Sequence, residues 1–232
     1  LVIGSAATAS SFDVDAVQVN ECRFDAPNDD KDTINSAPNL AVEATRINAN
    51  LPSLLAAKGE APLSLGAAAS SLAIPSGQRL VRWDLGDDLV LVLRCQVNCA
   101  VAGEPAVMRA LLEYDWDRVG SAGKDWRRQL DIQRAAVIAA ELKHNQAQMC
   151  RWVGAAVLGS VNRFKLAFCS RISPRDRTRH ALLSVYDLEP HEFAHQMRMD
   201  LANGFGIVKA LSRRFLDVLQ GDGRLIVMRD PQ

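Results

Sequence analysis

The chain has 232 residues, of which 48% are hydrophobic and 23% charged, and its formal net charge is zero. This composition is close to that of an ordinary soluble domain, and the length is sufficient to bury one sizeable core. No apolar run approaches the roughly 18 residues of a membrane-spanning helix, and the first residues lack the basic start of a signal peptide.

The first third of the chain predicts a strand, a helix and a low-complexity segment. Apolar and polar residues alternate over 12–21, as in a half-buried strand. After a polar loop, apolar residues at helical spacing predict a helix over 39–57 with Asn39 as its N-cap. Residues 59–78 are rich in Ala, Ser, Gly and Pro and show little periodicity, so we expect a mobile insertion there.

The rest of the chain mixes predicted strands and helices. We expect two strands within 79–97 around the turn "DLGDD", a strand or short helix over 106–117, a buried strand over 134–143, a helix over 145–159 that Gly159 ends, a hairpin of 164–172 and 179–188, and a last strand over 223–230. Pro190 should open a long helix to about Gln220, with a break near 203–204. These elements predict a single α/β (α+β) domain, residues 1–232, built on mixed β-sheet with flanking helices.

Cysteine usage indicates a reducing compartment. The five cysteines, at positions 22, 95, 99, 150 and 169, are odd in number and form no Cys-x-x-Cys motif. Such usage is typical of reduced thiols in the core of a cytoplasmic protein. Because the chain does not begin with methionine, we expect it to be a fragment of a longer protein.

The segment "QLDIQRAAVIAAELKHN", residues 129–145, contains an Asp, a Glu and a Lys at suggestive spacing. In a strand, Glu141 and Lys143 would lie on the same side, and the carboxylate of Asp131 could approach Glu141. Two close carboxylates can hold Mg²⁺, and a nearby lysine can neutralise a phosphate. A solvated Glu and Lys at a strand end is the alternative that the spacing leaves open.

Two further patterns bear on function. Residues 163–180 carry six basic residues and one acidic residue, so they form either a phosphate-binding face or a solvated loop. The sequence "HEFAH", residues 191–195, matches the H-E-x-x-H motif of zinc peptidases. Because Pro190 places this motif in the first turn of a helix, we expect an amphipathic helix with exposed histidines instead.

Six long blocks carry a family resemblance. They are "NSAPNLAVEATRINANL", "RWDLGDDLVLVLRC", "DWRRQLDIQRAAVIAAELKHN", "CRWVGAAVLGS", "RTRHALLSVYDLEPHEFAHQM" and "NGFGIVKALSRRFLDVLQGDGRLIVMRDP". From about residue 11 onward, the chain resembles the d subunit family of the eukaryotic translation initiation factor three complex. The resemblance implies a fold similar to that of the decapping exoribonucleases. It implies binding of capped mRNA near the mRNA exit side of the small (40S) ribosomal subunit, with the other subunits of the complex as partners.

The resemblance also implies a former hydrolase site. In decapping exoribonucleases a helix supplies a metal-binding Glu, and a Glu-x-Asp pair and a Glu-x-Lys complete the site. Here Asn48 stands in place of the helix Glu, and Gln129 stands in place of the Glu that precedes Asp131. Glu141 and Lys143 retain the Glu-x-Lys.

Two amides in place of carboxylates lack the charge that holds two Mg²⁺ ions, so we expect a binding pocket that needs no metal or other cofactor and is not an enzyme. A metal-dependent RNA 5′-end hydrolase is the alternative function. Glu at both 48 and 129 should then create activity if only ligand charge is missing. A buried hydrogen-bonded cluster of Asp131, Glu141 and Lys143 is the purely structural alternative.

A cap-binding pocket needs a flat group to stack on the methylated base, an acid for the edge of that base, and cations for the phosphates. Asp131 and Glu141 are the candidate acids. His144, Trp126 and Trp152 are candidates for stacking, although Trp152 lies in an apolar helix and is typical of a core position. The residues expected to bind cap or RNA are Arg46, Asn48, Gln129, Asp131, Glu141, Lys143, His144, Arg151 and Arg171.

Overall fold

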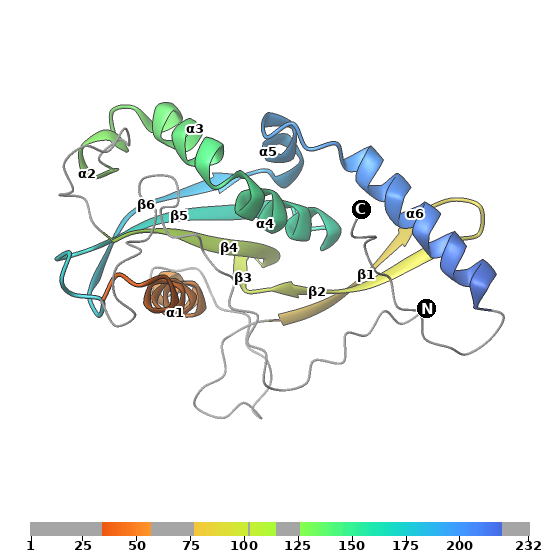
Figure 1. Ribbon diagram of the computed structural model, residues 1–232, viewed down its shortest axis with the longest axis horizontal. Coiled ribbons are helices and arrows are strands. Elements are labelled where there is room, and N and C mark those ends of the chain that lie inside the picture. Colours follow the sequence, from red (N-terminus) through yellow and green to blue (C-terminus); the bar gives the residue numbers. More distant parts are fainter. Residues whose placement is uncertain (1–33, 57–76, 102, 115–125, 220–232) are drawn as a thin grey trace, which may run out of the picture.

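The computed structural model describes residues 34–56, 77–101, 103–114 and 126–219 (Figure 1). The strands expected over 12–21 and 223–230, and nearly all of the insertion expected over 59–78, lie outside the described residues. Within the described parts, helices and two β-sheets combine in a mixed arrangement, which confirms the predicted α+β class. The extent of the domain stays a prediction.

The described residues form six helices and six strands. The helices are α1 (Ala37–Ala56), α2 (Trp126–Gln129), α3 (Arg134–His144), α4 (Gln146–Leu158), α5 (Pro190–Gln196) and α6 (Leu201–Val218). The strands are β1 (Gly77–Asp84), β2 (Val90–Val97), β3 (Cys99–Val101), β4 (Glu104–Glu113), β5 (Arg163–Arg171) and β6 (His180–Leu188).

A four-stranded mixed sheet, in the order β3-β4-β5-β6, forms the centre of the fold. β4 and β5 run parallel, and the other neighbours run antiparallel. Parallel strands need a long crossover, and α2, α3 and α4 lie in the connection from β4 to β5. The predicted hairpin is confirmed as β5 and β6, and the choice left open at 106–117 resolves as strand β4.

The two strands expected within 79–97 are confirmed as β1 and β2, but they form a separate antiparallel sheet. Their turn uses positive φ angles at Gly86 (76°), Asp87 (55°) and Asp88 (59°). Glycine and aspartate are among the residues that adopt this conformation most readily. The Asp87 carboxylate then binds Nζ of Lys209 and Nη2 of Arg213, both at 2.7 Å, so the turn also holds α6.

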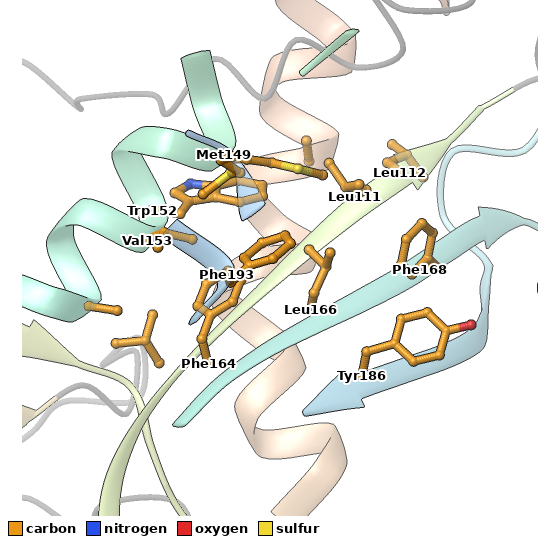
Figure 2. Close-up of a cluster of buried hydrophobic side chains, with 14 of the residues drawn as sticks. Leu111, Leu112, Met149, Trp152, Val153, Phe164, Leu166, Phe168, Tyr186 and Phe193 are labelled. Atoms are coloured by element: carbon orange, nitrogen blue, oxygen red, sulfur yellow. The ribbon is translucent and has the colours of Figure 1, made fainter. Parts of the chain in front are cut away.

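The two faces of β5 differ in side-chain size. Phe164, Leu166 and Phe168 point toward the face covered by α3, α4 and α5, where the larger core lies (Figure 2). Ala167 and Cys169 belong to a smaller core on the opposite face, against α1. Successive residues of a strand point to opposite faces, so β5 is buried on both sides. The small side chains allow α1 to approach the sheet closely.

Residues 134–143, expected as a buried strand, form most of helix α3. Four alanines among the eleven residues of α3 favour a helix. Val137 and Glu141, four residues apart, are both buried, as they are when one helical stripe faces the core. A short apolar run does not by itself distinguish a strand from a helix, which is why the prediction was wrong.

The long helix expected from Pro190 is broken earlier than predicted. α5 ends at Gln196, and α6 begins at Leu201, so the break does not lie at 203–204. Asp200 explains the new start, because its side chain accepts a hydrogen bond of 2.8 Å from the backbone N–H of Asn203. This is the bond that an N-cap residue makes.

The helices predicted on either side of the sheet are confirmed, with small changes at their ends. α1 begins at Ala37, so Asn39 lies in its first turn and is not its N-cap. α4 ends as expected, with Gly159 as the C-cap. Within the described part of the chain, no helix has the length and apolar character needed to cross a membrane.

Candidate functional site

The residues expected to bind the cap separate onto two faces of the central sheet. α1, which carries Arg46 and Asn48, packs on one face, and α3 and α4 cover the other (Figure 1). The remaining expected residues, apart from Arg171 of β5, belong to α2, α3, α4 and the loop after α2: Gln129, Asp131, Glu141, Lys143, His144 and Arg151. The structure therefore does not gather the expected set into one pocket.

Glu141 and Lys143 do not share a side, so the arrangement predicted from a strand is wrong. Residues two apart on a helix point in nearly opposite directions, and Lys143 is exposed whereas Glu141 is 3% exposed. Oε1 of Glu141 accepts a hydrogen bond of 2.9 Å from Nε1 of Trp126, and Oε2 accepts one of 3.1 Å from Nδ2 of Asn145. Asp131 is exposed. Glu141 is therefore a buried hydrogen-bonding centre that joins α2 to α3.

Asn48 completes the edge of β4. Its Nδ2 donates to the carbonyl of Ala110 at 3.2 Å, and its Oδ1 accepts from the N–H of Ala110 at 2.8 Å. Asn98 makes the same pair of bonds to Met108, at 2.9 and 2.8 Å. Both amides continue the edge along which β3 pairs with β4 through Cys99 and Ala106. Asn48 thus fixes α1 to the sheet with both ends of its amide.

The other expected residues on the α2–α4 side also differ in exposure. Gln129 is half-buried, and its Oε1 has no hydrogen-bond partner among the described residues. Arg151 is exposed on α4. Trp152 is 3% exposed, which confirms it as a core residue. Trp126 is fully buried and packs edge-on against Phe168, with 4.9 Å between the ring centroids. Neither tryptophan can therefore stack on a ligand without leaving the core.

Arg171 is the centre of a buried ionic network and not a surface cation. Its side chain is fully buried at the end of β5. Nε donates to Oε1 of Glu43 at 2.8 Å, and Nη2 donates to Oε2 of the same carboxylate. Nη1 donates to Asn35 at 2.7 Å and to the carbonyl of Pro174 at 2.8 Å. His180, at the start of β6, places Nε2 at 2.7 Å from Oε1 of Glu43.

This network keeps Glu43 ionised. Burial of the carboxyl raises its pKa, but the hydrogen bonds from Arg171 and His180 outweigh burial, and the pKa lies below its ordinary value of 4.5. Each carboxylate oxygen already accepts at least one of these hydrogen bonds. The charge of Glu43 is therefore directed into the protein.

A groove lies directly beside this network, and we call it the α1 groove. Its volume is about 840 Å³. Apolar residues, three arginines and one acid share its lining, which includes Glu43, Arg46, Ile47, Leu51, Cys169, Ile172, Arg177, Thr178, Arg179, His180 and Leu182. These residues come from α1, the end of β5, the following turn and β6. No aromatic ring other than the His180 imidazole lines the groove within the described residues.

The three arginines differ in how firmly they are held. Arg46 is exposed and makes no hydrogen bond or ion pair with any residue that the structure describes. Arg177 donates to Oδ1 of Asn39 at 3.3 Å. Arg179 pairs with Asp176, whose pKa is lowered by hydrogen bonds from Thr178 and Arg179. Charge on the groove is thus positive at Arg46 and Arg177 and locally balanced at Arg179.

Two buried acids do not stand out in the sequence. Glu43 is easily overlooked, although it stands within the helix "NLAVEATRIN". Glu113, the last residue of β4, is fully buried opposite Ser170 of β5. The sequence signal for it is an intact Glu-x-Asp at 113–115. Glu113 itself ends β4 beside the parallel strand β5, and ligands of parallel sheets commonly bind at the carboxyl ends of their strands. Gln129 and Asp131 therefore have a rival for the Glu-x-Asp position.

The "HEFAH" segment forms the Pro-opened helix that was expected. Pro190 occupies the first turn of α5, and Glu189 caps the helix by accepting from the backbone N–H groups of His191 and Glu192. His191 and His195 are exposed, as predicted. Within the described residues, no three His, Cys, Asp or Glu side chains lie close enough together to hold a metal ion.

Comparison with known proteins assigns the chain to one family. A family model described as eukaryotic translation initiation factor 3 subunit 7 matches residues 7–232. The chain is 36% identical over 229 residues to the D-1 subunit of eukaryotic translation initiation factor 3 from Drosophila ananassae and from Drosophila melanogaster. It is 36% identical over 230 residues to the D-2 subunit from Drosophila erecta. Each match covers 94% of this chain, which spans only about two fifths of the length of these relatives, 40% or 41%.

Proposed function

Because the chain belongs to the eukaryotic translation initiation factor 3 subunit 7 family, whose relatives are named as D-type subunits of that factor, we propose that it binds the 5′ end of mRNA in the α1 groove. The observation that carries this proposal is a groove of about 840 Å³ whose lining combines three arginines with apolar side chains. Arginine binds phosphate through paired N–H donors, and single-stranded RNA needs both phosphate contacts and apolar or planar surface.

The groove suits the phosphate chain better than the methylated base of the cap. That base is cationic, so stacking it on Arg46 or Arg177 would bring like charges together. Glu43, an acid that lines the groove, already accepts from Arg171 and His180. We therefore assign the triphosphate bridge and the first nucleotides of a capped 5′ end to the α1 groove. The base itself would be held by residues beyond those that line the described groove.

Non-enzymatic binding fits the site better than hydrolysis does. A two-metal hydrolase needs carboxylate oxygens that face the substrate phosphate. Glu43 directs its oxygens to Arg171 and His180, and Glu141 directs its oxygens to Trp126 and Asn145. Asn48 and Gln129 lie on opposite faces of the sheet, so Glu at both positions would not build one metal site. We no longer expect that double substitution to create activity.

Family membership also supports the expected partners. We propose association with the other subunits of initiation factor 3 and with the small (40S) ribosomal subunit, in the cytoplasm. The exposed α2–α4 side, which carries Lys143 and Arg151, is available for such contacts if RNA occupies the α1 groove.

The decisive experiment uses the full chain, a capped RNA oligonucleotide and its uncapped twin. Binding and product formation are followed together, in Mg²⁺ and in EDTA. We expect both RNAs to bind and to stay intact in both buffers, and capped RNA to bind more tightly. Shortening or cap release that requires Mg²⁺ would establish a hydrolase instead, and failure to bind either RNA would overturn the proposal.

A further inference from the structure

His180 lies where the buried ionic network meets the α1 groove. Its ring lines the groove, and its side chain is 18% exposed. Nε2 lies 2.7 Å from Oε1 of Glu43, which is 3% exposed. No hydrogen bond joins Nδ1 to any residue that the structure describes. One ring nitrogen is therefore committed to the protein, and the other is available to a ligand.

The chemistry of Glu43 decides which nitrogen carries the hydrogen. An ionised carboxylate only accepts hydrogen bonds. Arg171 donates to both oxygens of Glu43 and matches its charge. A contact of 2.7 Å between Nε2 and a carboxylate oxygen therefore requires a hydrogen on Nε2. In a neutral imidazole the other nitrogen, Nδ1, then carries a lone pair and acts as an acceptor.

The groove around the ring is rich in hydrogen-bond donors. The buried guanidinium of Arg171 balances the charge of Glu43, and Arg46 and Arg177 line the groove as well. With its hydrogen on Nε2, the neutral ring presents Nδ1 as a hydrogen-bond acceptor among these donors.

We propose that His180, held by Glu43 with its hydrogen on Nε2, accepts a hydrogen bond at Nδ1 from a ribose 2′-hydroxyl, so that the α1 groove selects RNA over DNA. This inference rests on the proposed function, which places single-stranded RNA in the groove. Phosphate oxygens have no hydrogen to donate and are repelled by the lone pair of Nδ1. The 2′-hydroxyl is a donor present at every ribonucleotide and absent from DNA, so it distinguishes the two.

Binding to the full chain at pH 7.5 tests the selectivity. The ligands are one single-stranded sequence made as RNA, as DNA and as 2′-O-methyl RNA, which keeps the oxygen but lacks the donated hydrogen. We expect RNA to bind about 3- to 10-fold more tightly than either analogue, the range for one neutral hydrogen bond. Equal affinity for RNA and 2′-O-methyl RNA would overturn the inference. Failure of the full chain to bind any of the three would overturn the proposed function, and the inference with it.

Two variants of His180 isolate the role of Nδ1. His180→Gln places an amide near the position of Nε2 and preserves the bond to Glu43, but it removes the acceptor at Nδ1. His180→Asn places an amide oxygen near the position of Nδ1. We expect the preference for RNA to vanish in His180→Gln and to survive in part in His180→Asn. A full preference in His180→Gln would overturn the inference even though the protein binds RNA.

Nuclear magnetic resonance gives a readout that does not depend on binding. In protein labelled with ¹⁵N-histidine, long-range ¹H–¹⁵N correlations distinguish a ring with its hydrogen on Nε2 from one with it on Nδ1 and from a protonated ring. We expect His180 to show the correlation pattern of a ring with its hydrogen on Nε2. We expect this pattern to be lost in Glu43→Gln. A hydrogen on Nδ1, alone or in a protonated ring, would overturn the inference.

Discussion

The two faces of the central sheet hold their charged residues in different ways. On the α1 face, Glu43 and Arg171 are buried together, and the exposed cations beside them border a groove. On the opposite face, large aromatic side chains fill the core, and Lys143 and Arg151 stand on the exposed sides of helices. Surface charges in open solvent contribute little, whereas charges along a partly enclosed groove act together on a ligand. The position of a cation, more than the number of cations, therefore favours the α1 face for the proposed binding of RNA.

The largest difference between the faces should appear when one ionic partner is removed. Arg171→Met leaves the buried carboxylate of Glu43 with only His180, and we expect a loss of about 3–5 kcal/mol in the free energy of unfolding. Lys143→Met, on the solvated face, should change it by less than about 0.5 kcal/mol. Urea unfolding of both variants measures the contrast. Similar losses would mean that the buried pair has no special role.

Acid should also lower the free energy of unfolding through the α1 face, but by less than Arg171→Met does. The pKa of Glu43 is lowered in the folded state, so its contribution is complete above its ordinary value of 4.5 and is lost as pH falls through the lowered folded value. We expect urea midpoints to fall below about pH 4.5. In Arg171→Met this part of the acid dependence should shrink. An unchanged profile in that variant would assign the acid sensitivity to other carboxyl groups.

On the opposite face, the buried carboxylate of Glu141 accepts hydrogen bonds from the neutral side chains of Trp126 and Asn145. Because these donors carry no charge, removal of Glu141 should cost less stability than removal of Arg171. Glu141→Leu leaves these two N–H groups without their acceptor. We expect a loss of about 1–3 kcal/mol, again by urea unfolding. Near-UV circular dichroism should report the change around Trp126. A loss above that of Arg171→Met would reverse the ranking of the two faces.

Substitution of exposed cations should change RNA affinity on one face and not on the other, without affecting stability. Arg46→Ala and Arg177→Ala should each weaken binding of single-stranded RNA about 5- to 10-fold and reduce the salt slope by about 0.7. Lys143→Ala and Arg151→Ala are the matched controls and should change affinity less than about 2-fold. Fluorescence anisotropy over a salt series measures both quantities. A stronger effect of the controls would move the RNA site to the α2–α4 side.

The smallest effect concerns two thiols, one on each face. Burial raises the pKa of Cys169 to about 12, and burial also raises the pKa of Cys150, which is only half-buried. At pH 8 we expect iodoacetamide to label Cys150 slowly and to label Cys169 only after unfolding. Mass spectrometry before and after urea treatment detects each product. Rapid labelling of Cys169 in the folded chain would mean that the smaller core opens readily.

Most elements could be predicted from sequence periodicity, but their pairing in space could not. Apolar segments on either side of a polar turn identified β1 and β2, and likewise β5 and β6, whereas helical spacing identified α1 and α4. The prediction of a strand over 134–143 was wrong because a short apolar run fits either a strand or a helix. The four alanines of α3 favour the helix. That one error placed Glu141 and Lys143 on the same side.

The site depended on contacts between distant residues, and sequence spacing does not contain these. Arg46 was expected and does line the groove, although the cap-binding role of the expected residues stays a prediction. Arg171 was expected at a phosphate but is paired with Glu43, 128 residues away in the chain. The amide of Asn48 was interpreted as a lost metal ligand, whereas its hydrogen bonds to Ala110 give it a structural role.

The asparagine amides along β4 also bear on how the protein behaves at high concentration. An open strand edge presents backbone donors and acceptors to which a strand from another molecule can add, and this is a common route to aggregation. At Met108 and Ala110 those groups are already bonded to Asn98 and Asn48. A side-chain amide satisfies the backbone without presenting a new edge of its own. Two asparagines thus end the sheet along this stretch and protect it from addition of a foreign strand.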